Sequence, residues 1–289
     1  MSTTCAAPVD VTLDHVGFIV QDLDASSGLV AQLGFTLTAR ADHSRTDANG
    51  VSVSTGSSQR SIMLENGYIE LMQITDPGAG HQLAAAPTVR FGLHVVAFGT
   101  SDAQACHTQC LSNGVSAGPV LHWARPVDEP GARGLARFAY FGAAWNALDP
   151  SYLCWVEHCS PELMRPPQLL RHSNEALGLV ELHYRGPRHL ALAWNARLLA
   201  AGARLACETP EALVLSLPNA AVHIDIDAGA TTLAASALRM DFSDCGGLRQ
   251  RCAELGLAHR ELEGGALDID LTAQLGMHWI CGPAAAAVN

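Results

Sequence analysis

Two histidines and a glutamate on apolar segments are the residues of this chain best suited to chemistry. His15 lies in the segment LDHVGFIV, and His94 lies at the matching place in FGLHVVAF. Glu70 lies in the segment YIELMQI, where an unpaired charge would be costly. Neutral imidazoles and carboxylate oxygens together suit a divalent transition metal. The pattern predicts a metal site that contains His15, Glu70 and His94; the competing interpretation is that Glu70 pairs with an arginine.

A fourth ligand is expected on the segment SYLCWVEH. The turn before this segment places Trp155, which is not a ligand, at the expected position. Glu157 lies two residues farther on and therefore on the same face of a strand. We predict Glu157 as the fourth ligand and keep His158 as the alternative, which would apply if a bulge shifts the register of the strand.

Three arginines are candidates for substrate recognition. Arg125, Arg133 and Arg137 could bind a carboxylate or another anionic group, because guanidinium makes paired hydrogen bonds to it. They lie in or beside the segment HWARPVDEPGARG (122–134), whose proline, glycine and charge predict a long loop. Trp155 and His158 are expected beside the cavity, and His172 is expected to cover its mouth. The alternatives are solvated surface charge for the arginines and core packing for the tryptophan.

Four copies of one unit are predicted to position these residues. Each copy has an apolar strand, a helix that ends at a glycine and then further strands. The glycines are Gly34, Gly114, Gly202 and Gly256. Such self-similarity, here with a period of about 75 residues, indicates a repeated supersecondary unit. The pattern predicts an α+β fold of four βαβββ modules, paired into two domains whose curled mixed sheets surround a cavity.

The expected boundaries follow from the four units. The first domain covers residues 1–160, with modules 11–76 and 90–158, and the second covers 177–289, with modules 177–228 and 236–283. Residues 161–176 contain consecutive prolines and form the connector. The second pair of modules is predicted to be degenerate, because it has Glu181 and Arg239 where the first pair has histidine, and arginine does not bind metals. His223, Asp225 and His278 could still build some other site, but we expect surface or packing roles for them.

Composition excludes several classes of partner. The 289 residues include 17 Lys plus Arg and 28 Asp plus Glu, a formal charge of −11 that would repel nucleic acid or an anionic membrane surface. No segment is typical of a signal peptide or a membrane span, so a cytoplasmic location is expected. The nine cysteines are scattered and are interpreted as reduced thiols. A homodimer remains a possible assembly.

The segments DHVGFIVQDLD, NGYIELMQI and GLHVVAFGTSD resemble the vicinal oxygen chelate superfamily, specifically glyoxalase-like proteins with four modules. The resemblance covers residues 11–175, and more weakly the rest. It implies a divalent ion (Fe, Zn, Ni or Mn) held by His15, Glu70 and His94, with the fourth ligand in doubt at Trp155. It also implies a small substrate with neighbouring oxygens.

Two functions follow from the resemblance. The first is a metal-dependent enzyme with isomerase, lyase or dioxygenase chemistry, in which Glu70 or Glu157 moves a proton. The second is a metal-free protein of the bleomycin-resistance type, which binds or sequesters a small molecule in the same cavity.

Overall fold

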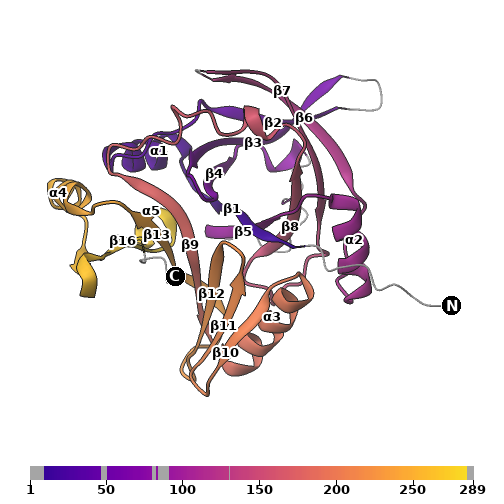
Figure 1. Cartoon of the computed structure of the whole chain (residues 1–289). Helices are drawn as coiled ribbons and strands as arrows, with labels where there is room; N and C mark the ends of the chain where they lie inside the picture. Colours follow the sequence, from indigo (N-terminus) through magenta and orange to yellow (C-terminus); the bar gives the residue numbers. More distant parts are fainter. Residues whose placement is uncertain (1–9, 47–50, 80–82, 84–90, 130, 285–289) are drawn as a thin grey trace.

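The computed structural model describes residues 10–46, 51–79, 83, 91–129 and 131–284. Four modules follow one another along the chain, each with one strand, one helix and three strands (Figure 1). The first module comprises β1 (Thr12–Ile19), α1 (Leu23–Gln32), β2 (Ala41–Thr46), β3 (Ser52–Met63) and β4 (Tyr68–Ile74). The second comprises β5 (Gly92–Gly99), α2 (Ala103–Ser112), β6 (Leu121–Glu129), β7 (Ala132–Gly142) and β8 (Tyr152–His158).

The second pair of modules repeats this order. The third module comprises β9 (Ala176–Gly186), α3 (Arg188–Ala200), β10 (Arg204–Glu208), β11 (Ala212–Leu217) and β12 (Ala220–Ile226). The fourth comprises β13 (Ala234–Phe242), α4 (Gly246–Glu254), β14 (His259–Glu261), β15 (Leu267–Leu271) and β16 (Met277–Pro283), with the short helix α5 (Thr272–Leu275) before β16. The α+β prediction of four βαβββ modules is confirmed.

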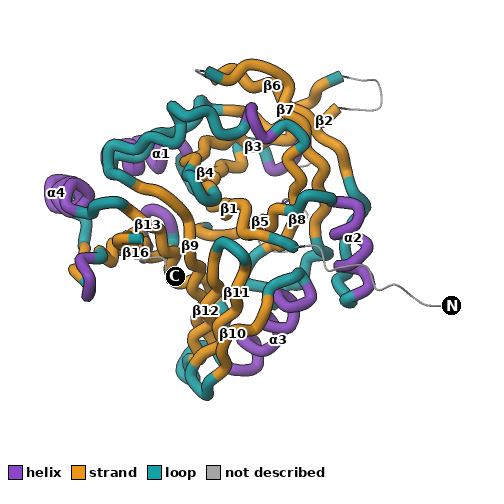
Figure 2. The backbone as a smooth tube through the Cα atoms, in the orientation of Figure 1, coloured by secondary structure: helices purple, strands orange, loops and turns teal. Residues whose placement is uncertain are grey.

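Each pair of modules forms one eight-stranded mixed sheet. The strand order is β2-β3-β4-β1-β5-β8-β7-β6 in the first sheet and β10-β11-β12-β9-β13-β16-β15-β14 in the second. The first strand of each module therefore lies in the middle, parallel to the last strand of its own module and antiparallel to the first strand of its neighbour. The first sheet curls strongly, with α1 and α2 outside the curl (Figure 2).

Side chains on β1 divide between two environments because alternate residues of a strand face opposite ways. Val16 and Phe18 belong to the main hydrophobic cluster, together with residues of the helices and of the second sheet. Ile19 instead joins Met72 and Val95 in a smaller cluster on the inner face of the curl. The two faces of the first sheet thus have separate functions: one packs against helices and the other sheet, and the other encloses a cavity.

The expectation of a long loop over residues 122–134 is wrong. Strands β6 and β7 form a hairpin there, with Pro126 opposite Leu135. Proline lacks a backbone N–H, but β6 is the edge strand of the first sheet, where one side needs no partner. Gly131, at φ 80°, provides the turn. Among the described residues, no helix is both long and apolar enough to cross a membrane.

Candidate active site in the first sheet

The inner face of the first sheet encloses a cavity of about 170 Å³. Its walls are mainly apolar and aromatic, with Tyr68 from β4, Trp123 from β6 and Tyr140 from β7 among the lining residues. The acidic and basic residues of the lining are His15, His43, Glu70 and Arg125. A concave, largely apolar space with a few converging polar groups is typical of a small-molecule site.

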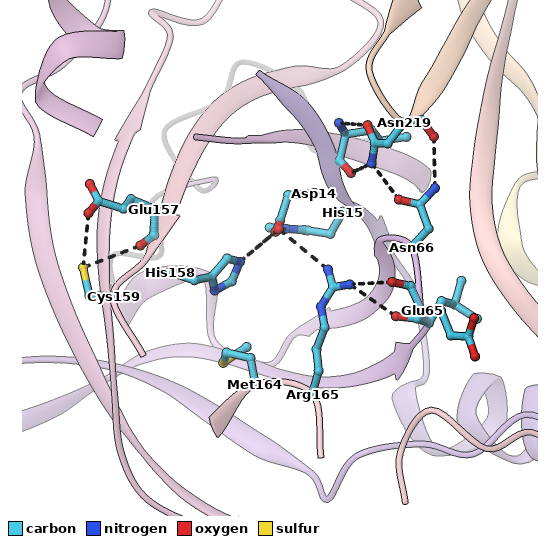
Figure 3. A network of polar contacts seen from close by, with 12 residues as sticks. Asp14, His15, Glu65, Asn66, Glu157, His158, Cys159, Met164, Arg165 and Asn219 are labelled. Carbon is cyan, nitrogen blue, oxygen red and sulfur yellow. Dashed lines mark hydrogen bonds and ion pairs between the residues drawn. The ribbon is translucent and has the colours of Figure 1, made fainter. Parts of the chain in front are cut away.

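A buried carboxylate, Asp14, orients His15. Asp14 Oδ2 lies 2.8 Å from His15 Nδ1, and Asp14 Oδ1 lies 3.0 Å from His158 Nε2. Arg165 approaches the same carboxylate at 4.0 Å, and its other contacts are backbone carbonyls (Figure 3). Burial alone would raise the pKa of Asp14, but the hydrogen bonds and charges of His15 and His158 outweigh it and hold this pKa well below its ordinary range.

The ionised state of Asp14 assigns the protons on both imidazoles. A carboxylate can only accept hydrogen bonds, so His15 donates from Nδ1 and His158 donates from Nε2. Nε2 of His15 is then the ring nitrogen that remains for exchange with a molecule in the cavity. The His15 ring also stacks on Tyr68, with centroids 4.3 Å apart, which limits its rotation.

Glu70 is the second acidic group of the site, and it lines the cavity itself. Its Oε1 lies 3.5 Å from Nε2 of His43, whose Nδ1 lies 2.7 Å from Ser57 Oγ. Burial would raise the pKa of Glu70, but the hydrogen bond and charge of His43, followed by the charges of His15 and Arg125, lower it below the ordinary value. Glu70 is therefore an ionised carboxylate in a largely apolar cavity.

Bulges in the central strands separate His94 from this group. Leu13 pairs with Phe98 and His15 with Ala97, which leaves Asp14 outside the ladder. In β5, the pairs Gly17–Val95 and Phe18–Leu93 leave out His94 in the same way. His94 is thus the structural equivalent of Asp14, and Val95 is the equivalent of His15. Because a slip of one residue moves a side chain to the other face, the structure does not bring His94 to the cavity.

His94 and Val95 have different surroundings. His94 is fully buried, with its ring centroid 5.1 Å from that of Trp145. Val95 lines the cavity. The matching of LDHVGFIV with FGLHVVAF in the sequence was therefore one residue out of structural register.

In β8, the last strand of the second module, the residue that faces the cavity is also one position away from the one expected from the sequence. The cavity-lining residues of β8 are Tyr152, Cys154 and Val156, and Cys154 pairs with Ala97 as Glu70 pairs with Gly17. Cys154 thus occupies the place that corresponds to Glu70. Burial, followed by the charges of Glu70 and Asp14, raises the pKa of this thiol, so it stays protonated and is a poor ligand.

Trp155 and Glu157 lie on the opposite face of β8, which corrects the expectation that they face the cavity. Trp155 is fully buried and stacks on Phe141 at 4.8 Å. Glu157 Oε2 accepts a hydrogen bond of 2.8 Å from the backbone N–H of Ala103, at the start of α2. His158 is on the cavity side and contacts Asp14. Glu157 therefore caps helix α2 and does not lie in the cavity with Glu70.

Of the remaining candidates for substrate binding, one lines the cavity and the others lie elsewhere. Arg125 lines the cavity, with its guanidinium carbon 5.9 Å from the centroid of the Phe138 ring. Arg137, on the other face of β7, is exposed. His172 is buried, accepts from the backbone N–H of Thr36 at 3.0 Å and donates to the carbonyl of Met63 at 2.8 Å. His172 thus ties the connector to the first sheet and does not line the cavity.

The cavity residues do not fit a three-ligand metal site in this arrangement. Ligand atoms around one ion lie close together, because each bond to the ion is only ~2.1 Å long. One group of three among the described residues has all its ligand atoms within 4.8 Å, and it is Glu181, His183 and His223 on the second sheet. His183 was not among the residues predicted from the sequence, and His223 was expected to have a packing or surface role.

Comparison with known proteins agrees with this architecture. The chain matches a family model described as a glyoxalase-like domain over residues 13–199. The chain belongs to this family. The resemblance to the vicinal oxygen chelate superfamily is thereby confirmed. No curated protein matches the chain.

Similar solved structures support the fold of the glyoxalase-like family over nearly the whole chain. A hypothetical protein from Staphylococcus aureus has a TM-score of 0.66 at 12% identity and covers 95% of this chain and 100% of its own. A mutant 4-hydroxymandelate synthase from Streptomyces coelicolor has a TM-score of 0.58 at 13% identity, covering 98% and 95%. A Mn(II)-bound glyoxalase from Novosphingobium aromaticivorans has a TM-score of 0.56 at 10% identity, covering 96% and 83%. At these identities the likeness concerns the fold alone.

Proposed function

We propose that the chain is a glyoxalase-like enzyme that binds a small carboxylate in the first-sheet cavity and moves a proton on it. The observation that carries the proposal is the ionised Glu70 inside a largely apolar cavity, next to His43 and in the field of His15. A titratable group with a shifted pKa and specific partners in a cavity is a functional candidate. The proposed reaction belongs to the isomerase or lyase class.

The substrate class follows from the lining of the cavity. Aromatic and aliphatic side chains form most of the walls and suit an apolar body. Arg125 is the cationic group for an anionic end. Among the described residues, no carboxylate lies within 4.0 Å of its guanidinium, which instead has Met164 Sδ at 3.7 Å and the Phe138 ring nearby. A guanidinium without a carboxylate partner can form paired hydrogen bonds with a substrate carboxylate.

The roles of the two central groups follow from their partners. Glu70, as a carboxylate, accepts a proton from the carbon next to a substrate carbonyl, and His43 holds the carboxylate in place. His15, whose Nδ1 proton is held by Asp14, must carry a second proton on Nε2 in this step, and it donates that proton to the substrate oxygen on which negative charge develops. Cavity side chains alone carry both proton transfers in this proposal; His15, His43 and Glu70 are not a three-ligand group in the described part of the chain.

Deuterium exchange tests the proposal and requires no identified product. A panel of small carboxylates with a neighbouring carbonyl or hydroxyl group is first screened for binding by thermal shift. Binders are then incubated in D₂O with the protein, and incorporation at the carbon next to the carbonyl is followed by proton NMR. We expect incorporation with the native protein, and a rate at least 100-fold lower with Glu70→Gln that still binds the carboxylate.

A matched arginine pair tests the substrate class. Arg125→Met should weaken binding of the carboxylate at least tenfold, whereas Arg137→Met, on the outer face of the same hairpin, should leave it unchanged. Equal effects of the two substitutions would contradict the role of Arg125.

A metal-free binding protein is the second candidate, and a specific observation favours it. Val95 and Cys154 occupy the places that correspond to His15 and Glu70, so the second module contributes no ionised group to the cavity from these positions. In that case the same carboxylates would bind, but no deuterium would be incorporated and Glu70→Gln would change affinity alone. This outcome would replace the enzymatic proposal.

A further inference from the structure

The second sheet carries a compact group of ligand-type side chains away from the first-sheet cavity. Glu181 and His183 lie on β9, and His223 lies on β12, directly opposite His183 in the parallel ladder. The two imidazole rings stack with centroids 4.6 Å apart and planes 9° apart. Nε2 of His183 lies 3.0 Å from Glu181 Oε2, and Nε2 of His223 lies 3.8 Å from the same oxygen.

The two distances to Glu181 are compatible with one small ion, and all three ligand atoms lie within 4.8 Å of one another. With bonds of ~2.1 Å and tetrahedral angles, ligand atoms around a divalent ion lie about 3.4 Å apart. The two distances to Glu181 Oε2 lie on either side of that value. A hydrogen-bond network alone accounts less well for His223, because 3.8 Å is too long for a hydrogen bond to Glu181. The side chains are 20–30% exposed, so an ion can reach them and water can fill the remaining positions.

The guanidinium of Arg239 holds the Glu181 carboxylate in one orientation. Arg239 Nη1 holds Glu181 Oε1 at 3.0 Å and leaves Oε2 facing the histidines.

The register of the two sheets relates this group to the first-sheet cavity. In β9, Glu181 follows the bulged residue Val180 as His15 follows Asp14. His223 pairs with His183 as Glu70 pairs with Gly17. The second sheet therefore has a carboxylate (Glu181) at the place of His15 and an imidazole (His223) at the place of Glu70. His183 occupies the place of Gly17. The second sheet thus offers one ligand more than the first at corresponding places.

We propose that Glu181, His183 and His223 bind one divalent ion of the zinc class, with solvent in the open coordination positions. Arg239 is a positioning residue that keeps the Glu181 carboxylate turned toward the two imidazoles. All three ligands come from the third module, because the corresponding strands of the fourth module contribute Ala237 and Ile280 at the places equivalent to Glu181 and His223.

Metal binding to purified, chelator-treated full-length protein tests the proposal. Zinc chloride is titrated calorimetrically, and bound zinc is counted by elemental analysis after dialysis. We expect one ion per chain and a dissociation constant at least tenfold larger for His183→Ala and His223→Ala. The matched control is His278→Ala, which removes a histidine of the same sheet that contacts Asp268 instead. Absence of zinc binding, or equal affinity in His223→Ala and the native protein, would overturn the proposal.

A measurement on the unsubstituted chain covers the case in which a variant does not fold. Cobalt(II) is added to ¹⁵N-labelled protein, and the broadening of backbone amide signals is mapped. Broadening centred on β9 and β12 supports the proposal. Broadening centred on β1 and β4 would place the ion in the first-sheet cavity and would overturn the proposal, together with the metal-free mechanism for Glu70.

Discussion

Replacing Asp14 with asparagine should disturb both stability and the orientation of His15. Asp14 is 6% exposed and serves two imidazoles at once, at 2.8 Å and 3.0 Å. Asparagine has nearly the same shape, but one of its two terminal atoms is an NH₂ donor. That donor would face a ring N–H of either His15 or His158. The substitution therefore removes a charge and forces one of the two imidazoles to change tautomer or move.

The magnitude follows from the two bonds. A hydrogen bond to a charged group contributes about 1.5–3 kcal/mol, and one of the two is lost outright while the other becomes neutral. Asparagine also avoids the desolvation cost of burying a charged carboxylate, which offsets part of this loss. We expect the free energy of unfolding at pH 7 to fall by about 3 kcal/mol, near the lower end of the range for breaking a buried ion pair.

Urea denaturation of Asp14→Asn and the native protein measures this difference, and long-range ¹H–¹⁵N NMR reports the tautomer of His15. Asp24→Asn is the matched control, because Asp24 is 71% exposed and its ion pair with Arg40 is long at 3.4 Å. Exposed pairs of this kind contribute about 0–1 kcal/mol. A loss below about 1 kcal/mol for Asp14→Asn, or a loss equal to that of the control, would refute the assignment of Asp14 as a buried anion that holds two histidines.

The sign of the pH dependence gives a second check. The folded-state pKa of Asp14 lies well below the ordinary value of 3.8, so the unfolded chain takes up this proton first as pH falls. The stability contributed by Asp14 is therefore complete above about pH 4 and is lost at more acidic pH. The difference between the native protein and Asp14→Asn should shrink as pH falls below 4, whereas an unchanged difference down to pH 2 would contradict the ionised state.

Three further predictions concern residues that the tertiary structure moves away from the cavity. His172→Ala should lower the free energy of unfolding by about 1–3 kcal/mol, because it leaves buried backbone groups without partners. Burial lowers the pKa of His172, so this stabilisation should be present above pH 6.5 and decline below it. Urea denaturation at several pH values measures the decline. Trp155→Ala should cost about 3–5 kcal/mol by leaving a void beside Phe141, with ligand binding by the folded fraction unchanged in calorimetry. Glu157→Ala should cost about 1 kcal/mol through loss of the cap on Ala103 and leave the zinc content unchanged; loss of zinc would restore Glu157 as a ligand.

The sequence alone was sufficient to predict the architecture of four modules in paired sheets. Each module repeats the change from an apolar strand to a capped helix that ends at a glycine, and these signals are local: Asp22 caps α1, and Gly34 adopts φ 94° just after it. Four such units in one chain limit the fold to paired sheets with helices on one face. The hairpin of β6 and β7 escaped prediction because Pro126 is acceptable only on an edge strand, and the edge is known only once the sheet is assembled.

The sequence also identified two cavity residues, His15 and Glu70, because polar groups within apolar strands are costly unless they have partners. Only the tertiary structure decided which residues join them. The bulges at Asp14 and His94 each shift the ladder by one residue, and the side-chain period of a strand is two, so one extra residue reverses every face beyond it. A bulge depends on pairing between distant strands. For the same reason the group of Glu181, His183 and His223 became visible only when β9 and β12 were placed side by side.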